Sequence, residues 1–286
     1  MRALECSVVI DIAMTETARE ADYVLPATTQ LEKAEATFFN FEFPENYFPV
    51  RAPLFPAPAG VLDEAELHAR ITEALGGIPS GILDELDSAL TEGGREAFRN
   101  LVFKKLGDDP TIGRIAPVLL YRTLGKTLPN KMQNAAAVWA VCHQHALAKR
   151  SSVEAAGITG EGMDLGDNLF DAIIDGPSAV VISKEDWSDI WNRVPGGAIN
   201  FDLPDMLGAA ANLNSEEPQE TTDEFPFLMS AGERRDYTAN TIFRNPAWRR
   251  KDRDGAMYMN PEDAARLNLG DGSNARITSQ RGVVEV

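Results

Sequence analysis

The sequence predicts an α/β protein built from three parts, because the spacing of apolar residues changes twice along the chain. Short β-branched runs alternate with helical segments over residues 1–78. Apolar residues at helical spacing dominate residues 79–213, and short strands around one helix fill residues 225–286, which suggests a small β-barrel. The acidic, Pro-containing residues 214–224 read as the linker before the last part.

Composition excludes several classes of protein. With 44% hydrophobic and 25% charged residues, the 286-residue chain resembles ordinary globular proteins. Its formal net charge of −17 argues against a nucleic-acid partner, because a phosphate backbone needs a basic face. No apolar run approaches the roughly 20 residues needed to span a bilayer. We therefore expect neither nucleic-acid binding nor a membrane span.

In the first part, we expect strands at Ser7–Ile10 and Tyr23–Leu25 with a short helix, Thr15–Ala21, between them. Thr17 and Glu20 have the spacing of a capping box for that helix. Such a strand–helix–strand order is typical of a parallel sheet.

A loop rich in aromatic residues and prolines, Phe38–Pro58, follows the second strand. An amphipathic helix is then expected over Glu64–Leu75, with Leu67 and Ile71 on its apolar face and two glycines ending it.

The middle part is predicted to be mostly helical, with one strand at Ala179–Ile182 followed by a helix over Glu185–Arg193. The other helices are expected at Ile82–Leu90, Gly94–Leu106, Ile112–Thr123 and Lys131–Lys149.

In the last part, Asn260 and Pro261 are suited to the N-cap and first position of a short helix. A turn at Gly270–Gly272 and another at Arg281–Gly282 separate the strands that follow. Strands are expected at Phe227–Ser230, Ala256–Met259 and Asn274–Thr278, with a final one after Gly282.

Cys6 and Cys142 are too few and too far apart for a zinc knuckle or an iron–sulfur cluster. We expect two separate reduced thiols, with Cys6 buried near the first strand, although spacing leaves a disulfide between them open. Strand patterns begin almost at Met1 and run to Val286, so we expect the chain to be truncated at both ends.

Two segments carry a family resemblance. The first, Val8–Glu42, reads VVIDIAMTETAREADYVLPATTQLEKAEATFFNFE. The second, Phe227–Pro246, reads FLMSAGERRDYTANTIFRNP and is followed by MNPEDAARLNLGDGSNARITSQRGVVEV. In this order they resemble the dimethyl-sulfoxide-reductase superfamily of molybdopterin oxidoreductases, which includes formate dehydrogenase- and nitrate reductase-like catalytic subunits.

This resemblance implies a partial Rossmann-like α/β domain at one end and the start of a double-psi-type barrel that binds the molybdopterin dinucleotide at the other. It also implies the cofactor, molybdopterin guanine dinucleotide with Mo or W, and a two-electron oxidation or reduction of a small substrate. The metal ligand and any iron–sulfur cluster would lie outside this chain, so the chain alone is expected to be inactive.

In the first segment, the resemblance assigns cofactor contacts to Asp11, Thr15, Lys33 and an acid at Asp63 or Glu64. An acid at the end of a strand suits a ribose hydroxyl or the N–H edge of guanine. Each residue also has a structural alternative: Asp11 could cap the next turn, Thr15 the next helix, and Lys33 could be a surface charge. An acid at position 63 or 64 could simply complement the helix dipole.

In the second segment, the family's binding loop maps onto residues 231–240. Glycine lets backbone approach a ligand, arginines suit a pyrophosphate, and amide and hydroxyl groups add uncharged hydrogen bonds. Glu233 stands where an arginine is commoner, and the E-K loop of the first segment lacks its usual glycine. The residues assigned to cofactor binding here are Ala231, Gly232, Arg234, Arg235, Asn240 and Thr241.

Other functional motifs are weaker. His143 and His145 are two positions apart on a predicted helix, so they point in different directions and do not form a metal site. Two alternatives to a redox enzyme stay open: a non-catalytic relative like the large iron–sulfur subunit of complex I, and a free-standing nucleotide-binding module. The expected partners are the rest of the polypeptide and an electron-transfer subunit. The default location is the cytoplasm, or the periplasm if an export signal precedes Met1.

Overall fold

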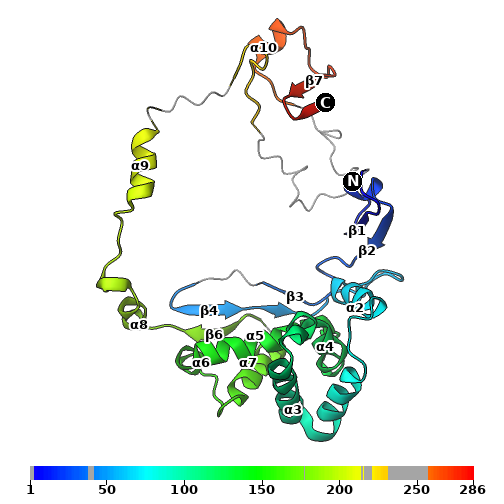
Figure 1. Ribbon diagram of the computed structural model, residues 1–286, viewed down its shortest axis with the longest axis vertical. Coiled ribbons are helices and arrows are strands. Elements are labelled where there is room, and N and C mark those ends of the chain that lie inside the picture. Colours follow the sequence, from blue (N-terminus) through cyan, green and yellow to red (C-terminus); the bar gives the residue numbers. More distant parts are fainter. Residues whose placement is uncertain (1–2, 38–41, 177, 214, 216–220, 231–256) are drawn as a thin grey trace. The chain divides into compact units, whose positions relative to one another are not determined.

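The computed structural model describes residues 3–37, 42–176, 178–213, 215, 221–230 and 257–286 (Figure 1). The chain divides into two units, Met1–Ile199 and Asn200–Val286. Helices and small two-stranded sheets make up these units, and the described strands form no closed barrel. The mixed α/β class is therefore confirmed, while the predicted boundaries at residues 78, 213 and 224 remain predictions.

A parallel pair of strands begins the first unit. Strand β1 (Val8–Asp11) pairs with β2 (Tyr23–Pro26), with Val8 opposite Tyr23 and Asp11 opposite Pro26. The Asp22 carboxylate accepts hydrogen bonds from the Ser7 backbone N–H at 2.7 Å and from the Ser7 hydroxyl at 2.9 Å. These bonds, foremost the backbone one, lower the pKa of Asp22 and fix the register where the strands begin.

The crossover helix α1 (Glu16–Arg19) is shorter than predicted, and the predicted capping box is wrong. Thr15 is the N-cap, and its hydroxyl accepts a hydrogen bond from the Ala18 N–H at 3.3 Å. Thr17 therefore lies inside the helix, where its backbone is already helical and cannot serve as a cap.

The segment predicted as the loop Phe38–Pro58 contains strands. Strand β4 (Glu45–Phe48) pairs antiparallel with β6 (Val180–Lys184), and β3 (Glu35–Ala36) pairs with β5 (Val50–Arg51). The Asn46 amide donates to the Ser183 hydroxyl across 137 positions of sequence. Strand β4 was not predicted, and the strand that completes its pairing lies far along the chain.

Helices α2 (Glu64–Ala74) and α3 (Ile82–Asp108) follow. The two helices predicted at 82–90 and 94–106 are confirmed as two helical segments within α3, separated at Gly94, whose backbone is not helical and whose φ of 71° only glycine adopts readily. The remaining helices of this unit are α4 (Ala116–Arg122), α5 (Val138–Ala148), α6 (Arg150–Ala155), α7 (Asp164–Asp175) and α8 (Trp187–Asn192). Short 3-10 turns lie at Pro110–Arg114, Leu124–Thr127, Gln133–Ala137 and Pro195–Gly197.

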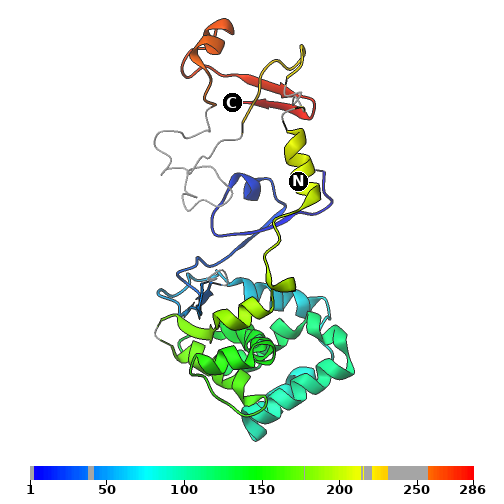
Figure 2. The same ribbon diagram turned by 90° about the vertical axis from the view of Figure 1, so that its left-hand side faces the viewer.

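Helix α7 forms the centre of the core and was not predicted. Its apolar residues Leu165, Leu169 and Ile173 recur at helical spacing, a signal that the sequence analysis missed although Gly166 and the aspartates are poor helix formers. It packs along α5, and α6 and α7 also contact β6 (Figures 1 and 2). A Cβ at Gly166 would lie 2.3 Å from Nδ1 of His143, so only glycine allows this approach. The largest fully buried side chains are Trp139, Phe98 and Phe170.

One buried carboxylate ties three helices together. Asp167 accepts hydrogen bonds from Arg99 Nη1 at 2.5 Å and from Trp139 Nε1 at 2.7 Å, and His143 Nε2 lies 3.4 Å away. Burial by itself would raise the pKa of Asp167, but hydrogen bonds from His143, Trp139 and Arg99 outweigh it and lower the pKa. The charged aspartate is therefore the form that stabilises this core.

The second unit contains α9 (Pro204–Asn212), α10 (Pro261–Arg266) and the hairpin of β7 (Arg276–Ser279) and β8 (Gly282–Glu285). The predicted cap is confirmed, because the Asn260 side chain accepts from the Glu262 N–H at 2.9 Å. The strands predicted at Phe227–Ser230 and over residues 257–259 are wrong, since nothing among the described residues pairs with their backbones. Helix α9 was not predicted.

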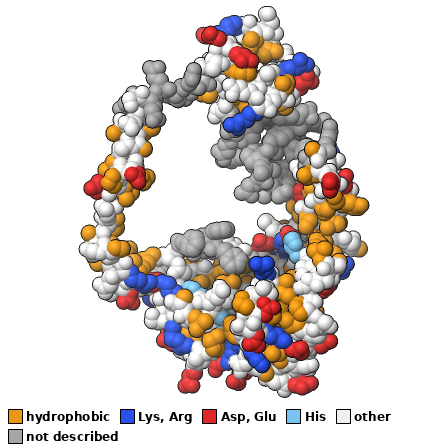
Figure 3. All heavy atoms as spheres, in the orientation of Figure 1, with side chains coloured by type: hydrophobic (Ala, Val, Ile, Leu, Met, Phe, Trp, Pro, Cys, Tyr) orange, Lys and Arg blue, Asp and Glu red, His pale blue; other side chains and the backbone are white. Residues whose placement is uncertain are grey.

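Both cysteines are free thiols, as expected, but Cys6 is exposed because it precedes β1 by two residues. Cys142 is buried in α5, which raises the pKa of its thiol. Acidic and basic side chains are interspersed on the face of the helical body in Figure 3. Within the described ranges, each helix is too short or too polar to cross a bilayer.

We expect Asp167→Ala to lower the free energy of unfolding by about 3–5 kcal/mol, because it leaves the Trp139 N–H without its acceptor and leaves Arg99 paired only with Asp164, whose side chain is 57% exposed. Urea unfolding at pH 7 measures this loss. The control is Asp175→Ala, an exposed position on the same helix, which should change stability by less than about 0.5 kcal/mol. Because the folded-state pKa of Asp167 is lowered, the wild-type advantage should be complete above the ordinary value of 3.8 and shrink below it. Equal losses in both variants would contradict this role.

Candidate cofactor-binding site

Three parallel chain segments end at one edge of the first sheet. Ala27, just after β2, donates its N–H to the Asp11 carbonyl at 3.0 Å, and Ala27 also bridges Leu62 in parallel. Leu62 donates to the Pro26 carbonyl at 3.3 Å. The residues that follow β1, β2 and Leu62 therefore emerge together, at the edge where ligands of parallel sheets bind.

Asp11 and Thr15 meet at the end of β1. The Thr15 hydroxyl donates to Asp11 Oδ2 at 3.2 Å, and Asp11 Oδ1 accepts from the Ile12 N–H at 2.7 Å and the Ala13 N–H at 3.4 Å. Thr15 also caps α1. Asp11 thus caps the turn after β1 and Thr15 caps α1, which are the structural roles that the sequence analysis gave as alternatives to cofactor binding. The same turn holds a carboxylate and a hydroxyl side by side at the sheet edge.

Lys33 and Glu64 form a second pair. Lys33 Nζ lies 2.6 and 2.7 Å from the two carboxylate oxygens of Glu64, and Glu35 is 4.0 Å away. The Lys33 side chain is only 18% exposed, so it is not an ordinary surface charge. The ion pair joins the loop after β2 to the first turn of α2.

Asp63 is the N-cap of α2. Its carboxylate accepts a hydrogen bond from the Glu66 N–H at 2.7 Å. Burial is the main cause that raises the pKa of Asp63, and the nearby charges of Glu64 and Glu66 raise it further. Of the two acids considered from sequence, Asp63 caps the helix and Glu64 holds Lys33.

Thr28 is a polar residue of this edge that sequence reasoning missed. It is 3% exposed, its N–H donates to the Leu62 carbonyl at 3.1 Å, and its hydroxyl has no hydrogen-bond partner among the described residues. Its only sequence signal is its position in the A-T-T run after a strand that ends in proline. A buried hydroxyl without a partner costs stability, so it marks a place suited to a further polar group.

The side chains gathered here fit the guanosine end of a dinucleotide. Asp11, Glu64 and Asp63 offer carboxylates that can accept N–H or ribose O–H groups, and Thr15 and Thr28 offer hydroxyls. Lys33 is a cation at this edge, and Glu64 already neutralises it. The set therefore does not by itself suit a pyrophosphate, which needs unpaired positive charge or clustered N–H groups.

The residues predicted to supply that charge lie outside the described part of the chain. They are Ala231, Gly232, Arg234, Arg235, Asn240 and Thr241. Their assignments remain predictions. Elsewhere in the described ranges, no group of three or more His, Cys, Asp or Glu residues could hold a metal ion.

Substitutions at Asp63 separate its capping role from its charge. Asp63→Ala should lower the free energy of unfolding by about 1 kcal/mol, because the Glu66 N–H loses its acceptor. Asp63→Asn keeps an acceptor and removes a charge whose raised pKa shows that burial disfavours it, so this variant should be at least as stable as wild type at pH 7. Urea unfolding of wild type and the two variants measures these free energies. An equal loss of unfolding free energy in Asp63→Asn and Asp63→Ala would contradict the capping argument.

Comparison with known families supplies the context for this edge. The family model for molybdopterin oxidoreductase matches residues 1–55. The model for the molydopterin dinucleotide binding domain matches residues 227–286. No solved structure matches the chain. In these two segments, which lie in this order along the chain, the sequence is similar to the molybdopterin oxidoreductase family.

Proposed function

We propose that this chain holds the guanosine end of a molybdopterin guanine dinucleotide carrying Mo or W, as part of an oxidoreductase of the dimethyl-sulfoxide-reductase superfamily. The observation that carries the proposal is the sheet edge where Asp11, Thr15 and Thr28, all within the segment that matches the molybdopterin oxidoreductase model, gather with Asp63. When bound, the cofactor supplies two-electron redox chemistry at its metal. The chain's own residues bind and orient it.

Asp11 would be the main recognition residue. Its carboxylate is held by the turn after β1, so it is pre-organised to accept the N–H edge of guanine or a ribose hydroxyl. Thr15 and Thr28 would add hydroxyl contacts beside it. Glu64 would hold Lys33 near the nucleotide as a neutral ion pair.

By the resemblance, Arg234 and Arg235 would contact the pyrophosphate of such a cofactor, and Asn240 and Thr241 would contact neighbouring oxygens. The match of residues 227–286 to a dinucleotide-binding domain supports this part of the proposal. It also favours a cofactor-binding chain over a relative that has lost the pterin. A small substrate and an electron-transfer subunit would engage other parts of the enzyme.

Guanine nucleotide binding tests this function. The chain should bind GDP more tightly than ADP in calorimetry. Asp11→Ala should weaken GDP binding roughly tenfold or more, because hydrogen bonds to charged groups are worth about 1.5–3 kcal/mol. Asp11→Asn keeps an acceptor for the Ile12 N–H and should also lose guanine preference, which separates recognition from folding of the turn. Equal binding of GDP and ADP, or wild-type binding by both variants, would sink the proposal.

Metal content gives an independent test. The gene product purified as its native cell makes it should contain molybdenum or tungsten, together with guanine released on acid hydrolysis. Elemental analysis and chromatography of the released base measure both. Protein that is folded and free of both metals would count against the assignment.

A further inference from the structure

The helical middle is attached to the nucleotide-binding edge at several points. Neither family model reaches residues 56–226, so the role of this segment has to come from its contacts. The Asn134 amide donates to the Ala34 carbonyl at 2.9 Å, directly after Lys33. Helix α4 packs on α2, the helix whose first turn carries Asp63 and Glu64.

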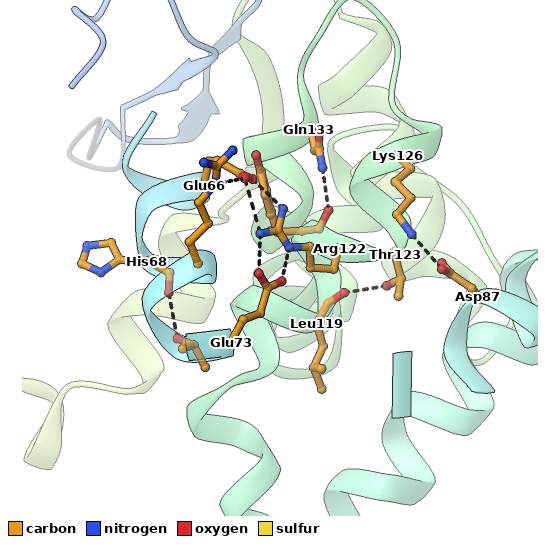
Figure 4. A network of polar contacts seen from close by, with 12 residues as sticks. Glu66, His68, Glu73, Asp87, Leu119, Arg122, Thr123, Lys126 and Gln133 are labelled. Carbon is orange, nitrogen blue, oxygen red and sulfur yellow. Dashed lines mark hydrogen bonds and ion pairs between the residues drawn. The ribbon is translucent and has the colours of Figure 1, made fainter. Parts of the chain in front are cut away.

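Arg122, at the end of α4, makes the strongest of these attachments. Its Nη1 donates to Glu66 at 2.5 Å, its Nε donates to Glu73 at 2.6 Å, and its Nη2 reaches Glu73 at 3.1 Å and Glu66 at 3.4 Å. Figure 4 shows the guanidinium between the two carboxylates of α2. Only the planar fork of an arginine can hold two carboxylates in this way.

The cluster is sheltered and continues toward the edge. The side chains of Arg122 and Glu66 are 18% and 16% exposed. Burial alone would raise the pKa of Glu66, but hydrogen bonds from Arg122, Arg70 and Tyr121 outweigh it and lower the pKa. The backbone N–H of Glu66 in turn donates to the Asp63 carboxylate. Glu66 therefore links Arg122, which its side chain contacts, to Asp63, which its backbone contacts.

From this chain of contacts we infer that Arg122 is a positioning residue for the nucleotide-binding edge. By holding Glu66 and Glu73 it fixes the direction of α2 and the place of its first turn. That turn sets Asp63 and the Glu64–Lys33 pair beside the end of β2. The inference rests on the proposed function for its ligand, whereas the ordering of α2 follows from the described contacts alone.

The experiment uses the full chain, GDP as the probe, and hydrogen exchange of the first turn of α2 as a readout that needs no ligand. The variants are Arg122→Gln and Arg122→Lys. Lys126→Ala is the matched control, because Lys126 lies four positions on and pairs at 2.7 Å with Asp87 of α3, away from α2 (Figure 4).

Arg122→Gln should weaken GDP binding roughly three- to thirtyfold, the range for mutations that act through a coupled element. It should speed exchange over residues 63–67 while α5 and α7 exchange as in wild type. Arg122→Lys should show smaller changes than Arg122→Gln in GDP affinity and in exchange over residues 63–67. Lys126→Ala should change neither the GDP affinity nor this exchange.

Several outcomes would overturn the inference. These are wild-type exchange over residues 63–67 in Arg122→Gln, faster exchange there without weaker GDP binding, or the same effects in Lys126→Ala. If the wild-type chain binds no GDP, the proposed nucleotide function and the ligand part of this inference both fail. Exchange then still decides whether Arg122 orders α2.

Discussion

Parallel backbone pairing of β1, β2 and Leu62 is the constraint on which the rest of the site depends. Each hydrogen bond across this small sheet brings the end of one more segment to the same edge. Asp22 fixes the register where the strands begin, so the acid that ends β1 cannot slip to another position. Without this pairing, nothing would hold Asp11, Thr28 and Asp63 at the same edge.

The polar groups at this sheet edge suit some parts of a nucleotide better than others, because of their charge. Its carboxylates and hydroxyls suit a base and a ribose, while its lysine is neutralised by Glu64. Negative phosphates would have to be held by other groups, and the second family segment carries the arginines suited to this task.

The helical middle has its own stabilising centre, in which Asp167 joins Arg99, Trp139 and His143. A buried charge of this kind requires well-defined geometry, because each unsatisfied group would cost free energy. The same helical segment contacts α2 through Arg122, and its strand β6 pairs with β4. A firm support outside the binding edge can therefore define where the edge's side chains lie.

The sequence by itself determined the resemblance to molybdopterin oxidoreductases in two segments, the mixed α/β class, β1 and β2, α2, the capped helix at Pro261 and the final hairpin. These features depend on local signals: β-branched runs, helical periodicity, a cap residue and paired glycine turns. The pairing of Lys33 with Glu64, the pairing of β4 with β6 and the burial of Thr28 beside Leu62 were decided only by tertiary structure. Each of these joins residues far apart in the chain, and single-sequence patterns carry no information on which distant backbone or charge will satisfy a given group.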